Sequence, residues 1–164
     1  MKTIQLSGKH GNNKVALVDD EDYELINKFK WHVKKHRNTF YAVRTEWVIG
    51  GNGEQRHFKM HRVVLGLTNV EEKCDHIDHD GLNCQKNNLR VATHAQNQQN
   101  TSARKNSTSK FLGVYVDRNY FHARIQKKHI GYFPKTEDGE LQAALAYDKR
   151  AKLEFGEFAN LNFK

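Results

Sequence analysis

The sequence predicts an α+β protein built from small antiparallel sheets and short helices. Short runs of alternating apolar and polar residues, separated by Gly- and Asn-rich turns, indicate strands in both halves of the chain. A polar stretch at 98–110 (QQNTSARKNSTSK) has no apolar periodicity and lies between them. We therefore expect two compact parts, 1–101 and 111–164, joined by a linker at 102–110.

The first part begins as a small antiparallel β region. TIQLS at 3–7 and KVALV at 14–18 predict two strands around the turn Gly11-Asn12-Asn13. Asp19–Asp22 then supply the cap, starting with Asp19, and the acidic first turn of a short helix. The next expected elements are strands at 31–33, 40–44, 47–49 and 56–59, with a hairpin turn at 50–53. The run at 60–67 (MHRVVLGL) predicts a short helix that is ended by Gly66. We expect Trp31 and Trp47 to contribute to a small core.

The segment from Cys74 to Asn100 is too polar to build a core. It predicts a strand at 73–77, a polar loop at 78–87, a second strand at 89–92 and a helix capped by Thr93. Such a segment is either a solvated loop or a functional site.

The second part predicts three strands and one helix. The strands are expected at 111–116, 121–126 and 130–133, with Pro134 ending the third. A helix runs from Thr136 to Gly156, and its expected apolar face consists of Leu141, Ala144, Leu145, Ala151 and Phe155.

The charge balance favours an anionic partner. The chain has 27 Lys+Arg against 19 Asp+Glu, a formal net charge of +8, and residues 101–164 alone carry 12 basic and 7 acidic side chains. Nucleic acid is the commonest partner for such a balance. Two cysteines are too few for a disulfide framework, and neither a signal peptide nor a membrane-length apolar run is visible. We expect a soluble, cytoplasmic protein with no membrane partner.

Asp75 and His76 are the pair with the clearest chemical potential. A histidine can take a proton from water near neutral pH, and a carboxylate can hold a divalent cation that polarises a phosphate. Adjacent strand residues point to opposite sides, so this pair can flank one phosphate only where the strand ends or twists. The Asp- and Gly-rich loop that follows supplies such an irregularity.

Four motifs together resemble the HNH endonuclease family: Met60-His61-Arg62, Asp75-His76-Ile77-Asp78, Asn87-Asn88-Leu89-Arg90, and Thr93 with Asn97. The resemblance implies a ββα-metal core over about 57–101. It implies that Asp75 is a metal ligand, that His76 is the general base and that Asn88 orients His76. Asn97 would be the second metal ligand, where the eponymous motif has His. His94, on the same helical face, is the alternative ligand.

The donor types bear on the metal. Oxygen donors from Asp75 and Asn97 suit Mg²⁺ or Mn²⁺, whereas His94 would make a transition metal more competitive. Zinc is not expected, because Cys74 and Cys84 form no CxxC pair. Asp78, His79 and Asp80 are expected as loop residues rather than ligands, with either acid as an alternative metal ligand. His61 and Arg62 face either a phosphate or the helix surface.

Residues 108–163 resemble the AP2/ERF DNA-binding domain. The resemblance rests on FLGV at 111–114, ARI at 123–125, IGYF at 130–133, AALAYD at 143–148 and ANLNF at 159–163. It implies a sheet that enters the major groove of DNA. The implied DNA-facing residues are Tyr115, Arg118, His122, Arg124, Gln126 and Lys128, with Arg104 and Lys105 of the linker near phosphates. Base readout and sequence-neutral phosphate contact both stay open.

The combined expectation is a metal-dependent endonuclease of homing or phage type that acts on double-stranded DNA. It would act as a monomer, nick one strand per site and need no small-molecule cofactor. The main alternative is a DNA-binding regulator whose catalytic region has degenerated, which Asn97 in place of His would favour. An RNA-binding protein fits the charge but not the motif spacing.

Overall fold

The computed structural model describes the whole chain except residues 37–38, 51–52, 102–105 and 164. The chain forms two compact units, Met1–Thr93 and His94–Lys164, and each is described by itself. Arg104 and Lys105 of the expected linker lie outside the described residues. The expected boundary after residue 101 stays a prediction, since the structure groups helix α3 (His94–Gln99) with the second unit.

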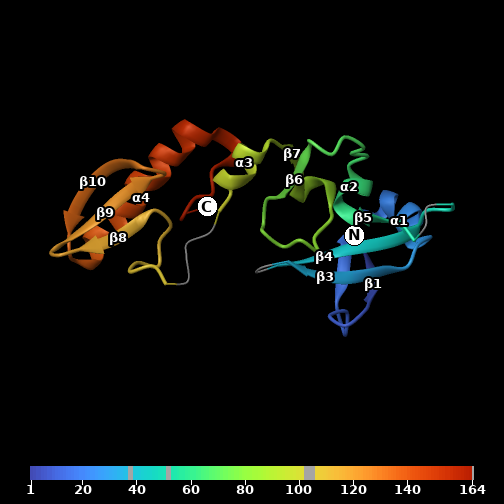
Figure 1. Cartoon of the computed structure of the whole chain (residues 1–164). Helices are drawn as coiled ribbons and strands as arrows, with labels where there is room; N and C mark the ends of the chain where they lie inside the picture. Colours follow the sequence, from blue (N-terminus) through green and yellow to red (C-terminus); the bar gives the residue numbers. More distant parts are fainter. Residues whose placement is uncertain (37–38, 51–52, 102–105, 164) are drawn as a thin grey trace. The chain divides into compact units, whose positions relative to one another are not determined.

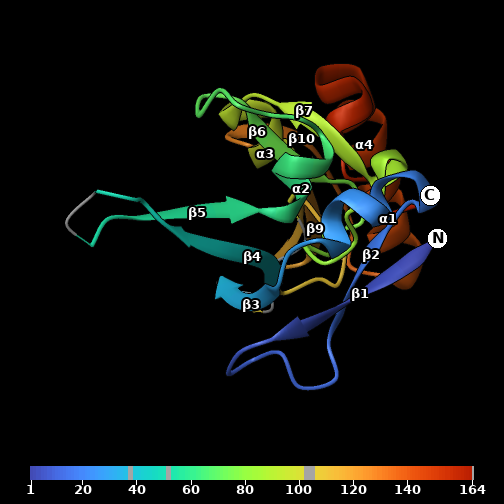
Figure 2. The same ribbon diagram turned by 90° about the vertical axis from the view of Figure 1, so that its right-hand side faces the viewer.

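A five-stranded sheet forms the body of the first unit, in the order β2-β1-β3-β4-β5 (Figure 1). Its strands are β1 (Lys2–Ser7), β2 (Val15–Val18), β3 (Trp31–His36), β4 (Thr39–Trp47) and β5 (Gln55–Lys59). β1 and β3 run parallel, and the other three pairs are antiparallel. Figure 2 shows β4 and β5 running side by side. The prediction of two strands at 40–44 and 47–49 was wrong, because Thr45 and Glu46 also pair with β5 and keep β4 continuous.

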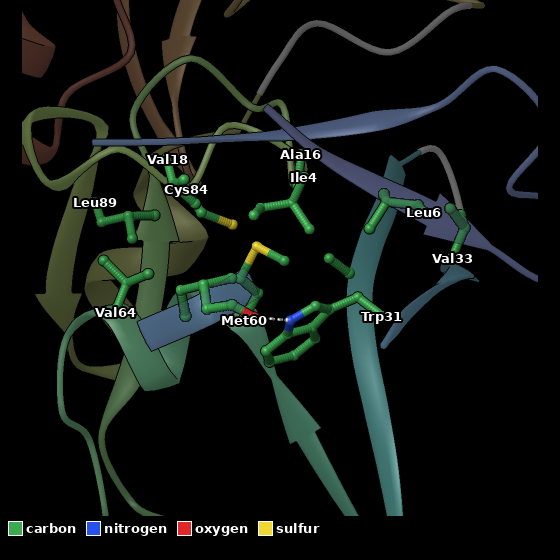
Figure 3. Close-up of a cluster of buried hydrophobic side chains, with 12 residues drawn as sticks. Ile4, Leu6, Ala16, Val18, Trp31, Val33, Met60, Val64, Cys84 and Leu89 are labelled. Carbon is green, nitrogen blue, oxygen red and sulfur yellow. Dashed lines mark hydrogen bonds between the residues drawn. The ribbon is translucent and has the colours of Figure 1, made fainter. Parts of the chain in front are cut away.

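Two short helices cover this sheet, α1 (Asp20–Asn27) and α2 (Met60–Val64). Figure 3 shows Trp31 and Met60 at the centre of the core, and the indole Nε1 of Trp31 donates to the backbone oxygen of Ile26 at 2.9 Å. Burial of Trp31 confirms one of the two tryptophan predictions. Trp47 is 67% exposed, so the other prediction was wrong: Trp47 is the last residue of β4 and lies opposite Gln55 of β5.

The segment after α2 folds as a small hairpin. β6 (Lys73–His76) and β7 (Leu89–Ala92) pair in antiparallel fashion, with His76 opposite Leu89. The 3₁₀ turn Lys86–Asn88 leads into β7, and α3 follows directly after Thr93, as predicted.

The second unit is a three-stranded antiparallel sheet covered on one face by a long helix (Figure 1). Its elements are β8 (Val114–Asp117), β9 (Tyr120–Ile125), β10 (Lys128–Pro134), α4 (Glu137–Phe155) and the 3₁₀ turn Gly156–Phe158. The hydroxyl of Thr136 accepts from the Gly139 N–H at 3.1 Å at the start of α4, and Gly156, with φ of +55°, ends it. Both helix boundaries agree with the sequence.

The face that α4 buries differs in part from the expected one. Ala143, Ala144 and Ala151 are fully buried against the sheet, and Tyr147 is 5% exposed. Leu141 and Leu145, which were expected in the core, are exposed. Small alanines let the helix approach the sheet closely, and this selects a helical face rotated away from the leucines.

The buried carboxylate of Asp148 joins α4 to the C-terminal segment of the second unit. Asp148 of α4 accepts hydrogen bonds from the backbone N–H groups of Asn162 and Phe163 and from the Asn162 side chain, at 2.8 to 3.0 Å. The Asn162 amide in turn bonds both backbone groups of Leu112. This clasp ties the C-terminal segment to the segment before β8. In the described part of the chain, no helix is long and apolar enough to cross a membrane.

Candidate active site

Asp75 and His76 lie at the carboxyl end of β6, and both side chains are buried, at 4% and 6% exposure. Asp75 Oδ2 accepts hydrogen bonds from Nε and Nη2 of Arg90, at 2.9 and 2.7 Å. Arg90 is the cross-strand neighbour of Asp75 on β7. A buried carboxylate is costly unless it is paired, and this register supplies the partner by placing Arg90 opposite Asp75.

Two aromatic rings from other elements contact the ring of His76. His61 of α2 meets it edge-to-face, with centroids 4.9 Å apart and planes at 87°, and Tyr41 of β4 lies at 5.8 Å. Tyr41 and His61 also contact each other, at 5.4 Å. Of the two alternatives left open for His61, the helix surface was wrong, since His61 is 5% exposed, and the phosphate contact stays a prediction. Tyr41 was not anticipated, and no local sequence signal links it to a motif some 35 residues later.

Arg62 braces the chain between α2 and β6. Its guanidinium donates to the backbone oxygens of Glu72 and Asn69, both at 2.6 Å, and of Leu67 at 3.4 Å. These bonds assign Arg62 a structural part in holding the turn, which sequence reasoning had left open between phosphate contact and the helix surface.

The rings of Tyr41, His61 and His76 are buried together, and burial disfavours the charged form of each side chain. It lowers the pKa of His61 to about 3, with smaller contributions from the charges of His76, Lys59 and Arg62. Burial also lowers the pKa of His76, against the opposing pull of the Asp78, Asp75 and Asp80 carboxylates. The pKa of Tyr41 is raised, again chiefly by burial. Both imidazoles are therefore neutral at physiological pH.

Asn88 holds the loop that follows His76. Its amide nitrogen donates to Asp78 Oδ1 and to the backbone oxygen of Asn83, both at 2.9 Å, and its Oδ1 accepts from the Asp78 N–H at 3.0 Å. Its backbone oxygen accepts from the N–H of Ile77 at 2.9 Å. Asn88 thus fixes the chain directly after His76, through the loop backbone and Asp78.

Asp78 and Asp80 take part in the same loop. Asp78 accepts from the N–H of Asp80 at 2.8 Å and from the Asn83 side chain at 2.7 Å, while Asp80 accepts from the N–H of Leu82 at 3.0 Å. These are the Asx turns expected of a tight polar loop, and they agree with the prediction that both acids, with His79, are loop residues.

The N-terminal region braces this loop from the outside. Leu17 of β2 bonds Leu82 and Cys84 through the backbone, at 2.9 and 2.8 Å. Asp19 accepts from the N–H of Lys86 at 2.8 Å and from the Gln85 side chain at 3.1 Å. The strands before α1 therefore position the loop.

Gly81 shows how closely the loop approaches the sheet. A Cβ at this position would lie 2.4 Å from the backbone oxygen of Phe40 and 2.7 Å from the ring of Tyr41. Its N–H donates to the hydroxyl of Thr39 at 3.2 Å. Only glycine fits here, and the same contact places Tyr41 beside the loop.

The donor set suits a hard cation. The charges of Asp75, Asp78 and Asp80 all act on His76, so negative charge converges at this end of β6. Within the described residues no three His, Cys, Asp or Glu side chains form a ready metal-binding group. Of the remaining ligand candidates, Asn97 is half-buried and His94 exposed. Both belong to the second unit, and their part in a metal site stays a prediction.

The environments of the two cysteines favour the neutral thiol. Both are free thiols, Cys84 buried and Cys74 half-buried. Burial raises the pKa of Cys74 to about 12 and raises that of Cys84 as well. Cysteine binds zinc as the thiolate, so burial weighs against these two side chains as ligands, and the identity of the metal stays a prediction.

In the second unit, the DNA-facing candidates divide between the open sheet face and the turns. Tyr115, His122 and Arg124 alternate with buried residues of β8 and β9. The others lie at strand ends and turns: Arg118 and Gln126, both with φ of +51°, and Lys128, which forms an ion pair with Glu154 at 3.2 Å. The sequence did not indicate Tyr120, His129 and Tyr132. Their rings contact one another or His122 on the same open face of the sheet.

Comparison with known proteins gives one informative match. The chain is 31% identical over 153 residues to the uncharacterised HNH endonuclease L560 of Acanthamoeba polyphaga mimivirus, covering 93% of this chain and 76% of that protein. No family model matches the chain. No solved structure matches it either.

Proposed function

Because this chain belongs to the HNH endonuclease family, we propose that it is a metal-dependent DNA endonuclease whose reaction centre is the Asp75–His76 pair. The observation that carries the proposal is the position of this pair at the end of β6, where both residues are buried and contact side chains from β4, α2 and β7. A solvated turn needs no such support, because its polar side chains are satisfied by water. The homing or phage type of enzyme is part of the proposal, supported by a viral relative.

His76 is the general base in this proposal. Its ring is packed between His61 and Tyr41, which restricts its rotation and keeps it in the neutral, proton-accepting form. It takes a proton from the attacking water, whose oxygen forms a bond to phosphorus. The bond from phosphorus to the leaving sugar oxygen breaks, and that oxygen takes up a proton from solvent water. Asn88 contributes by fixing the backbone that follows His76, so its catalytic part is one of positioning.

Asp75 supplies a carboxylate ligand, and Asn97 supplies the second oxygen ligand, as the family resemblance implies. Members of this family typically use a divalent metal, and the oxygen donors favour Mg²⁺ or Mn²⁺. When bound, such a cation stabilises charge on the phosphate and on the leaving oxygen. Arg90 also bonds Asp75, and these two hydrogen bonds orient the carboxylate and offset its negative charge.

The second unit is proposed to hold DNA as an AP2-like module. Its sheet has one face covered by α4 and one face open, and the open face carries Tyr115, His122 and Arg124. The basic charge of residues 101–164 supports contact with phosphates. A single reaction centre in a monomer then cuts one strand per encounter.

A supercoiled-plasmid assay tests the proposal. The full chain with Mg²⁺ or Mn²⁺ should convert supercoiled plasmid to the open circle before any linear product appears, and EDTA should stop the reaction. Plasmid binding without nicking, in either metal and on several unrelated plasmids, would instead support the degenerate regulator. Equal initial rates of linear and open-circle product would contradict cutting of one strand at a time.

A further inference from the structure

The open face of the second sheet carries a row of aromatic side chains. Tyr115 of β8, His122 of β9 and Tyr132 of β10 lie directly opposite one another in the strand register. The rings of Tyr115 and His122 are stacked, with centroids 5.2 Å apart and planes at 19°, and Tyr132 lies 6.4 Å from His122. Because α4 packs against the other face, the row points away from the core.

Two further rings widen the row. Tyr120 meets Tyr132 edge-to-face at 5.5 Å, and His129 lies nearly parallel to Tyr132 at 6.5 Å. A nitrogen of His129 is 3.2 Å from one of His122, so the two imidazoles hold each other in place. Tyr132 is 67% exposed and Tyr120 46%. A fixed set of aromatic rings open to solvent is costly to leave bare, and it marks an interaction surface.

The charges around this row identify an anionic partner. Residues 114–135, which form the strands, contain five basic side chains and one acidic, whereas residues 136–163 contain three basic and six acidic. The basic residues border the rings: Arg118 lies in the β8–β9 turn, Lys127 in the β9–β10 turn, and Arg124 contacts the Tyr115 ring at 5.7 Å. Rings in the centre with cations at the border are the arrangement that binds a single nucleic-acid strand.

We propose that this face binds the unpaired bases of single-stranded DNA, with bases stacked on the aromatic row and phosphates on the bordering cations. The AP2/ERF resemblance implies binding in the major groove of a duplex, where only base edges are offered. A tyrosine or histidine ring has a single polar tip with which to meet an edge, so the aromatic row favours an unpaired strand on this face and departs from that mode. Unpaired bases offer whole faces, which match the exposed face of Tyr132. The choice of DNA over RNA rests on the proposed function, and the face would hold one strand of locally opened substrate.

Binding measured without cleavage tests the proposal. Fluorescence anisotropy of the full chain in EDTA is compared for a short labelled DNA strand, its duplex and the RNA of the same sequence. The single DNA strand should bind most tightly at equal salt. Tyr132→Ala should weaken that binding by about tenfold or more, while Tyr132→Phe should stay within about twofold of wild type. Leu145→Ala, an exposed apolar position on α4, is the matched control and should bind as wild type.

Three results would overturn the proposal: tighter binding of the duplex or of RNA, a Tyr132→Ala loss as large on the duplex as on the strand, or no loss at all. Sedimentation showing self-association that Tyr132→Ala abolishes would overturn it too, by assigning the face to a second copy. The proposed function fails separately. A chain that never nicks plasmid but binds single strands through Tyr132 would contradict the endonuclease while leaving this surface in place.

Discussion

At the residue scale, the environment of His76 depends on side chains that are far apart in the sequence. Its motif neighbour Asp75 is paired with Arg90, and its ring is enclosed by Tyr41 and His61. The motifs indicated Asp75 and His76, because a carboxylate beside an imidazole is informative by itself. They could not indicate Tyr41, because the contact arises only when β4 and the loop pack together around Gly81.

Replacing His61 tests whether this enclosure matters for the reaction. His61→Ala removes the ring that packs on His76, so His76 can rotate. We expect the single-turnover nicking rate to fall by about tenfold or more while DNA affinity is unchanged. His61→Phe retains an aromatic ring and should recover most of the rate, although its extra bulk costs some stability.

Rates from quenched plasmid reactions, anisotropy with DNA and thermal melts separate these effects. If both variants nicked plasmid at the wild-type rate, after correction for the folded fraction, His61 would have no part in the reaction beyond packing. A matching loss of DNA affinity would place His61 in substrate binding instead.

At the element scale, the N-terminal strands serve as a brace for the loop between β6 and β7. Leu17 and Asp19 both bond the segment 82–86. The sequence correctly indicated most strands, because alternation and Gly/Asn turns are local signals. It missed the role of Asp19, which it assigned to helix capping. In the structure Asp19 makes no side-chain cap bond to α1 and instead accepts from Lys86 and Gln85.

The hydrogen bonds that Asp19 accepts from Lys86 and Gln85 predict a pH-dependent contribution to the free energy of unfolding. The backbone N–H of Lys86, followed by the Gln85 amide, holds the pKa of Asp19 below its usual 3.8. A lowered pKa means that the folded state favours the carboxylate, so the contribution is fully present above about pH 4 and is lost as pH falls through the folded-state pKa.

Asp19→Asn should therefore reduce the free energy of unfolding by about 1 kcal/mol at pH 7, and its difference from wild type should shrink below pH 4. Urea unfolding at several pH values measures this. The exposed Glu24→Gln on α1 is the control and should show no such trend. A difference that persists unchanged at pH 3 would contradict the assignment.

At the scale of the whole molecule, the chain carries the proposed base His76 in the first unit and a basic sheet in the second. Charge indicated this division, since the basic excess is greatest after residue 100. Thr136 and Gly156 indicated the start and end of α4. Periodicity did not identify its buried face, because alanines pack closer to the sheet than Leu141 and Leu145, which are exposed. The aromatic row was missed in part, since Tyr132 faces Tyr115 and His122 only through strand register.

The central claim is that His76 performs the chemistry, and one comparison tests it most directly. Single-turnover nicking of supercoiled plasmid with Mg²⁺ is measured for wild type, for His76→Ala and for His10→Ala, an exposed histidine in the β1–β2 turn. Loss of a general base predicts a fall of about 10²–10⁴-fold for His76→Ala with DNA affinity retained, and no change for His10→Ala. Nicking by His76→Ala at the wild-type rate would contradict the account.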